Sequence, residues 1–451
     1  MIKVVKFGGS SLADTAQFRK VCDIIRADKD RRYVIDSAPG KRNSADEKVT
    51  DLLYRAQAEA AGGDDFSDTL AKIRARFEEI VKGLGCGGIS LDDEFETITR
   101  CLKEGATPDY AASRGEYLNG KILASHLGFE FVDAAEVIRF HADGTFDPET
   151  TNVLMGMRLE NAEYAVIPGF YGLVGSRDDN TDATEDPARI KTFSRGGSDV
   201  TGAIVARAVS ADVYENWTDV NGFLVADPRI VDNPERIETI TYMELRELAY
   251  MGASVLHEDA IFPVRKEGIP INIRNTNNPE DSGTWIVEST ARKTRYTITG
   301  IAGRKNFCGI NIEKDMMNSE VGFVRRVLTA FEQQNISIEH LPTGIDTMTV
   351  IVHQDEFIEK EQAVVSEIHR LTHPDLLEIE SDLALIAVVG RGMKRQRGTA
   401  GRIFSALAHN SVNVRMIDQG SSELNIIIGV ETRDFERAIR AIYDIFVTTN
   451  L

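Results

Sequence analysis

Two short segments of the chain combine a pair of glycines with a cation and hydroxyl side chains. The first holds Lys6, Gly8, Gly9, Ser10 and Ser11, and the second holds Arg195, Gly196, Gly197, Ser198 and Asp199. Glycine lets the backbone come close to a ligand, and the first N–H groups of a helix attract anions. The pattern therefore predicts a phosphate site, with an ordinary strand-to-helix turn as the plainer alternative.

The segments around these turns predict alternating strands and helices. An apolar strand at 2–7 leads into the first glycine pair, and a helix follows, capped by Asp14 or Thr15, with Phe18, Val21, Cys22 and Ile25 on one face. Further strands are predicted at 33–35, 129–133, 164–170 and 213–217. Several of these strands end in polar residues, which is where open α/β sheets bind ligands.

Composition limits the kinds of partner. The 451 residues predict two or three domains, and a net charge of −19 argues against nucleic acid as a partner. No apolar run is long enough to span a membrane, and no signal peptide precedes the first strand. The four cysteines, Cys22, Cys86, Cys101 and Cys308, form no CxxC pair, and the eight histidines have no ligand spacing. We therefore expect a cytoplasmic protein without a metal site of its own.

Two motifs match nucleotide-binding patterns by letter only. The range 83–88 reads GxGxxG but follows a predicted helix, whereas the mechanism needs a preceding strand. The range 115–121 has P-loop spacing, but Ile122 stands where a magnesium-binding serine or threonine is required. A Rossmann or Walker-type nucleotide site is therefore not predicted.

The last third of the chain is an internal repeat. A shift of about 76 residues aligns 307–312 with 383–388, Gly322 with Gly398, and Val327 with Ile403. Each copy predicts strand, helix, strand, strand, helix, and a closing strand is visible only in the first copy, at 376–379. Two ferredoxin-like βαββαβ units are expected, after a polar linker at 278–294.

Taken together, the motifs resemble those of the aspartate kinases, in the amino acid kinase family. The matching segments are 6–11, 195–199, 217–220, 227–229 and 252–257, followed by two ACT-type units. The resemblance covers nearly the whole chain. It implies an amino acid kinase domain at 1–290, a first ACT domain at 291–380 and a second at 381–451. The predicted fold class is α/β, with a mainly parallel sheet sandwiched by helices and two βαββαβ units behind it.

The resemblance also implies roles for individual residues. Lys6, Arg195 and Asp199 would be catalytic, and Thr50, Glu116 and Arg195 would bind the amino acid substrate. ATP with Mg²⁺ would be the cofactor, bound by Lys6, Gly8, Gly9, Ser10, Ser198, Thr218, Asp219, Asp227 and Arg229.

Simpler interpretations of some of these residues stay open. Glu116 on a helix could be a solvent-facing carboxylate, and Thr50 could be a helix N-cap. Asp219 could cap a turn, Arg229 could be merely exposed, and His257 is expected to be structural.

Three residues depart from the family pattern or fit the site poorly. Ser254 and Leu224 stand where relatives have a lysine and an aromatic residue beside the nucleotide. Asp36 would repel a nucleotide unless its carboxylate points away or is paired.

The implied reaction is transfer of the γ-phosphoryl group of ATP to the side-chain carboxylate of L-aspartate. The product, 4-phospho-L-aspartate, begins lysine, threonine and methionine biosynthesis. An aspartate carboxylate, with a pKa near 4, needs no general base, so catalysis should come from charge neutralisation. The alternatives are a glutamate or N-acetylglutamate kinase and a catalytically weak amino-acid sensor.

We expect feedback inhibition through the ACT units, by lysine or, as the alternative, threonine. The expected effector residues are Met316, Met317, Asn318, Gly322, Ser337, Ile338 and Asp346. Carboxylates at Asp346, Asp315 and Glu339 favour lysine. The repeat predicts a homodimer or a dimer of dimers, joined through the ACT units.

Overall fold

The computed structural model describes residues 1–85, 89–175, 186–194, 196–253, 256, 261–291 and 294–449. The chain forms two compact units. The first unit comprises residues 1–223, 238–242 and 255–290, and the second comprises 224–237, 243–254 and 291–451. The expected domain boundaries at 290 and 380 stay predictions.

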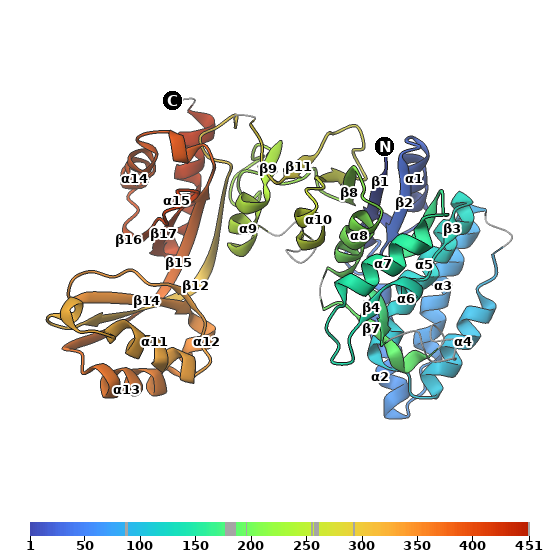
Figure 1. Ribbon diagram of the computed structural model, residues 1–451, viewed down its shortest axis with the longest axis horizontal. Coiled ribbons are helices and arrows are strands. Elements are labelled where there is room, and N and C mark those ends of the chain that lie inside the picture. Colours follow the sequence, from blue (N-terminus) through green and yellow to red (C-terminus); the bar gives the residue numbers. More distant parts are fainter. Residues whose placement is uncertain are drawn as a thin grey trace. The chain divides into compact units, whose positions relative to one another are not determined.

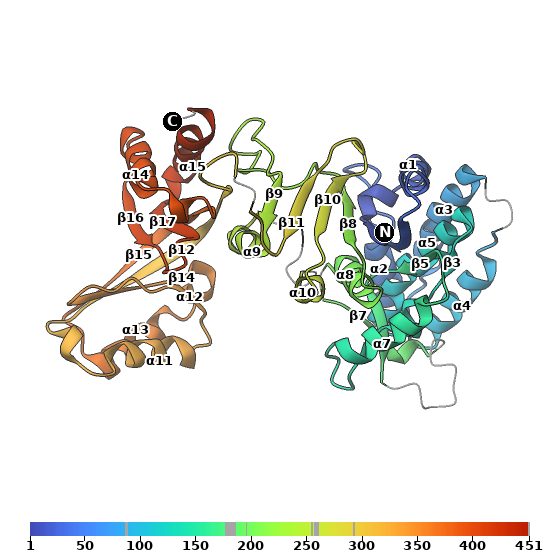
Figure 2. The same ribbon diagram turned by 45° about the horizontal axis from the view of Figure 1, so that its top comes forward.

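An eight-stranded sheet is the centre of the first unit (Figures 1 and 2). Its order is β3 (Glu130–Phe131), β5 (Ala165–Pro168), β2 (Arg31–Asp36), β1 (Lys3–Phe7), β8 (Val213–Thr218), β10 (Ile271–Asn275), β11 (Thr284–Val287) and β9 (Thr239–Thr241). All neighbours from β3 to β10 are parallel, and only the pair β10 and β11 is antiparallel. The predicted α/β class with a mainly parallel sheet is confirmed.

Helices cover both faces of this sheet. They are α1 (Thr15–Arg26), α2 (Val49–Gly62), α3 (Ser67–Leu84), α4 (Asp92–Lys103), α5 (Pro108–Leu127), α6 (Ala134–Val137), α7 (Pro148–Leu159), α8 (Gly197–Ala208) and α10 (Phe262–Lys266). Lys6 contacts α8, whereas Asp36, on the opposite face, contacts α5. A small second sheet joins β4 (Arg139–Phe140), β6 (Tyr171–Val174) and β7 (Ile190–Thr192).

The start of α1 shows how local sequence sets these elements. The Asp14 carboxylate accepts a hydrogen bond from the Gln17 N–H at 2.9 Å, which makes Asp14 the N-cap rather than Thr15. Phe18, Val21, Cys22 and Ile25 are all buried, as the periodicity predicted.

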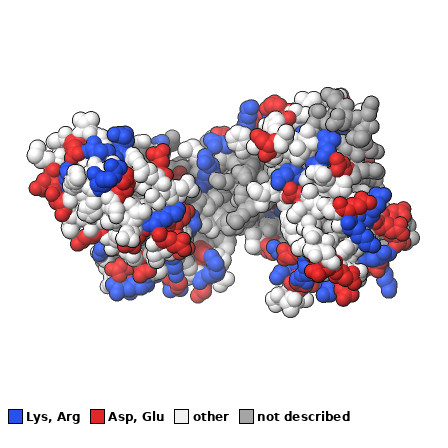
Figure 3. Space-filling model, turned by 90° about the horizontal axis from the view of Figure 1, so that it is seen from below, with Lys and Arg blue, Asp and Glu red and all other residues white. Residues whose placement is uncertain are grey.

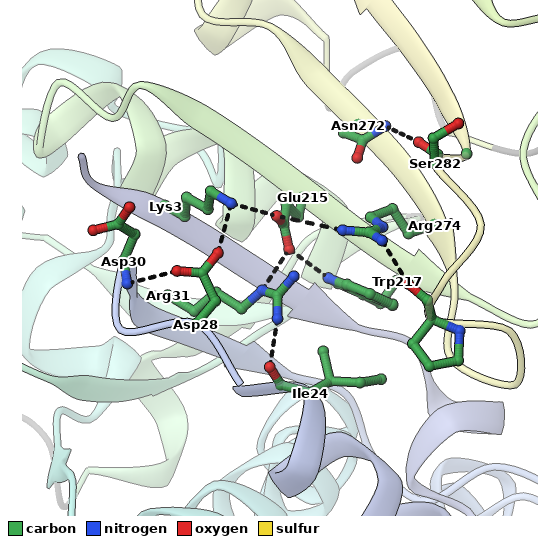
Figure 4. A network of polar contacts seen from close by, with 12 residues as sticks. Lys3, Ile24, Asp28, Asp30, Arg31, Glu215, Trp217, Asn272, Arg274 and Ser282 are labelled. Carbon is green, nitrogen blue, oxygen red and sulfur yellow. Dashed lines mark hydrogen bonds and ion pairs between the residues drawn. The ribbon is translucent and has the colours of Figure 1, made fainter. Parts of the chain in front are cut away.

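A buried carboxylate ties the strands β1, β2, β8 and β10 together (Figure 4). The Glu215 side chain is only 3% exposed, and its oxygens lie 3.3 Å from Lys3 Nζ and 2.9 Å from Arg31 Nε. The indole N–H of Trp217 donates to the same carboxylate at 2.9 Å, and the Trp217 ring packs against the guanidinium groups of Arg31 and Arg274. Arg274 Nη1 lies 4.0 Å from the same carboxylate, whereas Lys3 has a second partner in Asp28, at 2.7 Å. Glu215 therefore neutralises the buried charge that Arg31 and Arg274 share.

The second unit is built on a six-stranded sheet. Its order is β13 (Ile338–His340), β14 (Thr347–His353), β12 (Gly300–Glu313), β15 (Leu376–Val389), β17 (Asn425–Glu431) and β16 (Val414–Asp418). Its helices are α9 (Tyr242–Tyr250), α11 (Phe323–Gln333), α12 (Gln354–Ile358), α13 (Glu361–Thr372), α14 (Thr399–His409) and α15 (Phe435–Tyr443). Both predicted βαββαβ units are present.

The repeat is visible in the backbone. Gly322 and Gly398, 76 residues apart, are the N-caps of α11 and α14 and have φ values of 82° and 83°. The sequence shows no closing strand for the second copy, because that strand comes from earlier in the chain. Residues 300–305 at the start of β12 pair with 384–389, and 309–313 pair with 376–380. The two long strands are therefore shared by both units.

Two further findings concern the whole described chain. No helix among the described residues combines the length and apolar character that crossing a membrane requires. On the face drawn in Figure 3, the basic and acidic side chains of the described residues are interspersed.

The Glu215 network gives a prediction about stability. Glu215→Gln removes the charge but keeps the shape, so Arg31 and Arg274 lose their shared counter-charge, while Lys3 keeps its pair with Asp28. We expect the free energy of unfolding of the first unit to fall by about 3 kcal/mol or more, as for other broken buried ion pairs. Urea unfolding followed by the fluorescence of the two tryptophans, Trp217 and Trp285, which both lie in the first unit, measures this change.

The control is Glu78→Gln, which breaks the exposed Arg74–Glu78 pair on α3 and should leave the unfolding midpoint unchanged. Equal midpoints for the two variants would show that Glu215 is not a structural counter-charge.

Candidate active site

Lys6 lies near the centre of the eight-stranded sheet, one residue before the end of β1. Its side chain is largely buried, and Nζ lies 2.6 Å from Asp199 Oδ1. A β-carbon on Gly8 would lie 3.6 Å from Lys6 Nζ, so the ammonium group is beside the first glycine of the turn. The structure thus brings together Lys6, Asp199 and the glycine turn, which were all predicted from the sequence.

The second glycine of the turn is packed against the turn after β2. The Gly40 N–H donates to the Gly9 carbonyl oxygen at 2.9 Å. A β-carbon on Gly9 would lie 2.8 Å from the Ala38 carbonyl oxygen, and one on Gly40 would lie 2.7 Å from Gly9. Larger residues would therefore push the two turns apart. Ser10 is exposed, whereas Ser11 is buried with its hydroxyl 2.8 Å from that of Thr276.

Asp199 and Ser198 lie in the first turn of α8. The N-cap, Gly196, has a φ of 57°, a conformation that suits glycine. Asp199 Oδ1 also accepts a hydrogen bond from Asn216 at 2.8 Å, and the Tyr214 hydroxyl donates to the Asp199 carbonyl oxygen at 3.0 Å. Burial, together with the nearby Asp199, raises the pKa of Tyr214 far above its usual value, so this hydroxyl stays a donor.

Asn216 was missed by sequence reasoning. In the register of β1 and β8 it lies directly beside Lys6, and both side chains point to the α8 face. The alternation of residues in 213–218 could have placed Asn216 on that face once the pairing of the two strands was known.

Glu116 is not a solvent-facing carboxylate, so that simpler interpretation is wrong. It lies on the buried face of α5 and is 5% exposed. Burial raises its pKa to about 8, although a hydrogen bond from the Ala38 N–H and the charge of Arg114 act in the opposite direction. At neutral pH the free protein therefore holds Glu116 largely protonated.

Asp36 now has a physical explanation. Its carboxyl is fully buried, and neither oxygen has a hydrogen-bond partner among the described residues. Burial first, and then the nearby Glu116, raise its pKa well above the usual value. Strand alternation turns Asp36 to the face opposite Lys6, where Oδ1 lies 2.8 Å from the position of a β-carbon on Gly120. The raised pKa favours the neutral form of Asp36, and its side chain points away from the proposed phosphate site.

Thr50 is half-buried in the first turn of α2. The N-cap of that helix is Lys48, so the alternative that Thr50 is the N-cap is wrong.

The predicted nucleotide residues fall into two places. Thr218 ends β8, and its hydroxyl lies 3.3 Å from Asp219 Oδ1 at the exposed end of the strand. Asp227 and Arg229 belong to the second compact unit, where Arg229 Nη2 lies 2.6 Å from Asp227 Oδ2. This pair lowers the pKa of Asp227. Leu224 is half-buried in the same unit.

Some predicted residues lie outside the described residues, namely Arg195, Ser254 and His257, together with Cys86. The GxGxxG match at 83–88 also falls partly outside them. Among the described residues, no group of three or more histidine, cysteine, aspartate or glutamate side chains is arranged to hold a metal ion.

The expected effector residues gather at the start of the first βαββαβ unit. Asp346 Oδ1 accepts a hydrogen bond from the Met316 N–H at 2.9 Å, and the Asn318 N–H donates to the Ile345 carbonyl at 3.2 Å. Met317 is buried in the core of this unit, whereas Met316 is exposed. Gly322 caps α11, and Ser337 and Ile338 lie at the start of β13, where the Ser337 N–H is 3.4 Å from Glu356 Oε2.

Comparison with family models gives two matches. The amino acid kinase family matches residues 1–275, and the ACT domain matches residues 386–446.

Relatives of known identity match over the full length. The chain is 38% identical to aspartokinase 3 of Bacillus subtilis, over 99% of this chain and 98% of that protein. It is 50% identical to the crystal structure of the Clostridium acetobutylicum aspartate kinase, with a TM-score of 0.89 over 99% of this chain and 100% of that one.

Escherichia coli aspartokinase III is a more distant structural relative. It has been solved with lysine and aspartate in a T-state, with 25% identity and a TM-score of 0.71 over 98% of this chain and 99% of that one. The R-state complex with aspartate and ADP, at 24% identity and a TM-score of 0.72 over 99% of both chains, shows the same fold.

The raised pKa of Asp36 predicts a pH-dependent stability difference. Above about pH 4, Asp36 is ionised in the unfolded chain, whereas its raised pKa favours the protonated form in the folded chain. This group therefore lowers the free energy of unfolding as the pH rises towards the folded pKa. Asp36→Asn removes the effect. We therefore expect the variant to gain stability relative to the wild type as the pH rises above about 4, by up to about 1.4 kcal/mol per pH unit.

Urea unfolding at several pH values measures this difference. Asp143→Asn is the control, because hydrogen bonds from Thr145 lower the pKa of Asp143, which is then ionised in both states above pH 5. The difference in free energy of unfolding between Asp36→Asn and the wild type should change with pH. If it is as independent of pH as the difference for the control variant, Asp36 is ionised in the folded protein.

Proposed function

The chain belongs to the amino acid kinase family and is a kinase of the aspartate kinase type, and from that premise we propose that it converts L-aspartate and ATP to 4-phospho-L-aspartate and ADP. In this proposal it catalyses the first step of lysine, threonine and methionine biosynthesis in the cytoplasm. The observation that carries the proposal is the buried Lys6–Asp199 pair, placed between the glycine turn after β1 and the N-terminus of α8.

The proposed reaction needs no general base. A side-chain carboxylate oxygen of aspartate attacks the γ-phosphorus, a new O–P bond forms, and the bond to the bridging oxygen of ADP breaks without any proton transfer. Two anions must meet, so the rate depends on fixed positive groups near the equatorial phosphoryl oxygens. In this proposal Lys6, which lies beside the Gly8–Gly9 turn, supplies this charge. The Gly8 N–H does not, because it already donates to the Trp217 carbonyl oxygen at 3.1 Å.

Mg²⁺ fits this site through oxygen donors. It commonly binds one or two carboxylates together with the phosphates and water, and in this proposal the Asp199 carboxylate and the Ser198 hydroxyl, both in the first turn of α8, provide such donors. When bound with ATP, the ion would neutralise phosphate charge. In the same proposal Thr218 and Asp219 hold the nucleotide, and the roles of Asp227 and Arg229 stay predictions. E. coli aspartokinase III has been solved with ADP bound.

The amino acid is proposed to bind through both of its charged groups. Arg195 would bind the α-carboxylate, Thr50 would contact the amino acid, and Glu116 would bind the ammonium group. Because Glu116 has a pKa of about 8 in the free protein, an arriving ammonium ion must favour its ionised form. In this proposal a free amino group, which is charged, can stabilise the ionised carboxylate, whereas an uncharged N-acetylated nitrogen cannot.

A trapping assay tests the proposed function. With ATP, Mg²⁺, aspartate and hydroxylamine, we expect the wild type to form aspartyl hydroxamate in step with ADP release. Glutamate and N-acetylglutamate should give about a hundredfold less product. The longer side chain of glutamate would misplace its carboxylate, and N-acetylglutamate also lacks the charged amino group. Equal or greater product from glutamate would assign the chain to a different amino acid kinase activity, and no product from any of them would support the sensor alternative.

Feedback regulation is proposed at the effector residues of the first ACT unit. Met316, Val321 and Ile345 are exposed there, Val321 by 96%. Such a patch suits contact with a second copy of the chain, which supports a homodimer or dimer of dimers. The lysine bound to E. coli aspartokinase III supports lysine as the effector, with threonine as the alternative.

The effector proposal predicts inhibition by lysine. Asp346→Ala removes the carboxylate that accepts the Met316 N–H, so we expect at least a tenfold higher inhibitory lysine concentration, equivalent to about 1.4 kcal/mol. Met317→Ile, which changes the core beneath the same residues, should act in the same direction. Activity is measured against lysine and threonine, separately and together.

The matched control is Met393→Ile, at the equivalent position of the second unit, where we expect wild-type inhibition. The effector site is misplaced or absent if neither amino acid inhibits the wild type, or if both variants in the first unit respond like the control.

A further inference from the structure

Helix α3 carries a charged residue on its buried face. The residues of α3 that face the core are Thr69, Ile73, Arg76, Phe77 and Ile80. Arg76 is only 6% exposed, whereas Arg74 on the same helix is exposed and pairs with Glu78. A guanidinium group in an otherwise apolar stripe needs partners that satisfy it.

The partners of Arg76 come from three separate segments. Nη2 donates to the carbonyl oxygens of Ala13 and Gly40, both at 2.9 Å, and Nη1 lies 2.5 Å from Asp46 Oδ2. Ala13 ends the short helix η1 (Gly9–Leu12) that contains the glycine turn. Gly40 and Asp46 belong to the loop between β2 and α2. One side chain therefore fixes both sides of the proposed phosphate site.

These bonds act on the contact between Gly9 and Gly40. The Gly40 N–H is already bonded to the Gly9 carbonyl, and the two backbones are too close to admit a β-carbon on either residue. Arg76 holds the Gly40 carbonyl and the end of the Gly9 segment at the same time. The two turns are thereby fixed to each other and to α3.

Asp46 supplies the counter-charge and anchors the loop. Its carboxylate lies 3.0 Å from Arg42 Nε and also contacts Arg76. These contacts lower the pKa of Asp46 far below its usual range, and the contact with Arg42 has the larger effect. Arg42 in turn lies 2.9 Å from Glu79 on α3. Lysine could not replace Arg76, because only the planar guanidinium donates in several fixed directions.

We propose that Arg76 is a positioning residue for phosphoryl transfer, which holds the Gly8–Gly9 turn and the 40–48 loop in register with Lys6. The inference rests on the proposed function, since it assigns the turn to phosphate binding. Arg76 touches no reacting atom in this proposal. It acts through the carbonyl groups of Ala13 and Gly40.

Hydrogen exchange of the full chain without ligands, combined with kinetics, tests this proposal. In Arg76→Lys we expect amide exchange at 9–14 and 40–48 to be at least about tenfold faster than in the wild type, with the strands β1 and β2 unchanged. We expect kcat and the KM for ATP to worsen together, with kcat/KM lower by about 10- to 100-fold, the scale for misplacing reacting groups by about 1 Å. Arg74→Lys, on the same helix, is the matched control and should behave like the wild type.

A second variant separates positioning from general destabilisation. Asp46→Asn leaves the bonds of Arg76 to the two carbonyls in place, so exchange should be faster at 40–48 but stay at the wild-type rate at 9–14. The exchange measurement needs no catalysis, so it shows whether Arg76 holds the two segments even if the trapping assay rejects aspartate as substrate. Wild-type exchange at both segments in Arg76→Lys, or faster exchange with kcat/KM equal to that of Arg74→Lys, would overturn the proposal.

Discussion

The ion pair between Lys6 and Asp199 is the interaction on which the proposed active site depends. It joins the carboxyl end of the central strand β1 to the first turn of α8, and both side chains are mostly buried. A charge buried in this way needs its partner, because losing one member leaves the other uncompensated. Asn216 adds a second bond to Asp199 and fixes which way the carboxylate points. The ammonium group is therefore held in one place before any ligand binds.

A second constraint is the close approach of two backbone turns. Gly9 and Gly40 lie so close that neither position has room for a β-carbon, and the Gly40 N–H donates to the Gly9 carbonyl oxygen. Helix α3, which covers the sheet, links the two turns, because Arg76 donates hydrogen bonds to the carbonyl oxygens of Ala13 and Gly40. The helices outside the sheet thus do more than shield it from water. They determine the geometry of the loops at its carboxyl edge.

Local patterns in the sequence predicted a large part of this arrangement. The helix cap at Asp14 or Thr15 and the strand that contains Lys6 follow from short-range periodicity and turn chemistry, and the equivalence of Gly322 and Gly398 follows from the 76-residue repeat. The raised pKa of Asp36, the buried role of Arg76 and the origin of the last strand of the second ACT unit were not predicted. Each depends on which distant segments pack together, and periodicity does not report that. One signal for the role of Arg76 was present in the sequence, because a charged residue stands among the apolar residues that form the buried face of α3.

The most direct test of this account is a double-mutant cycle on Lys6→Met and Asp199→Asn, with kcat and the free energy of unfolding measured for all four proteins. The two residues should act as a unit, so the double variant should be no slower than the slower single variant, and each single loss should lower kcat by about a hundredfold or more. The unfolding data should give a coupling energy of about 1 kcal/mol or more. Additive losses in kcat with no coupling in stability would contradict the account.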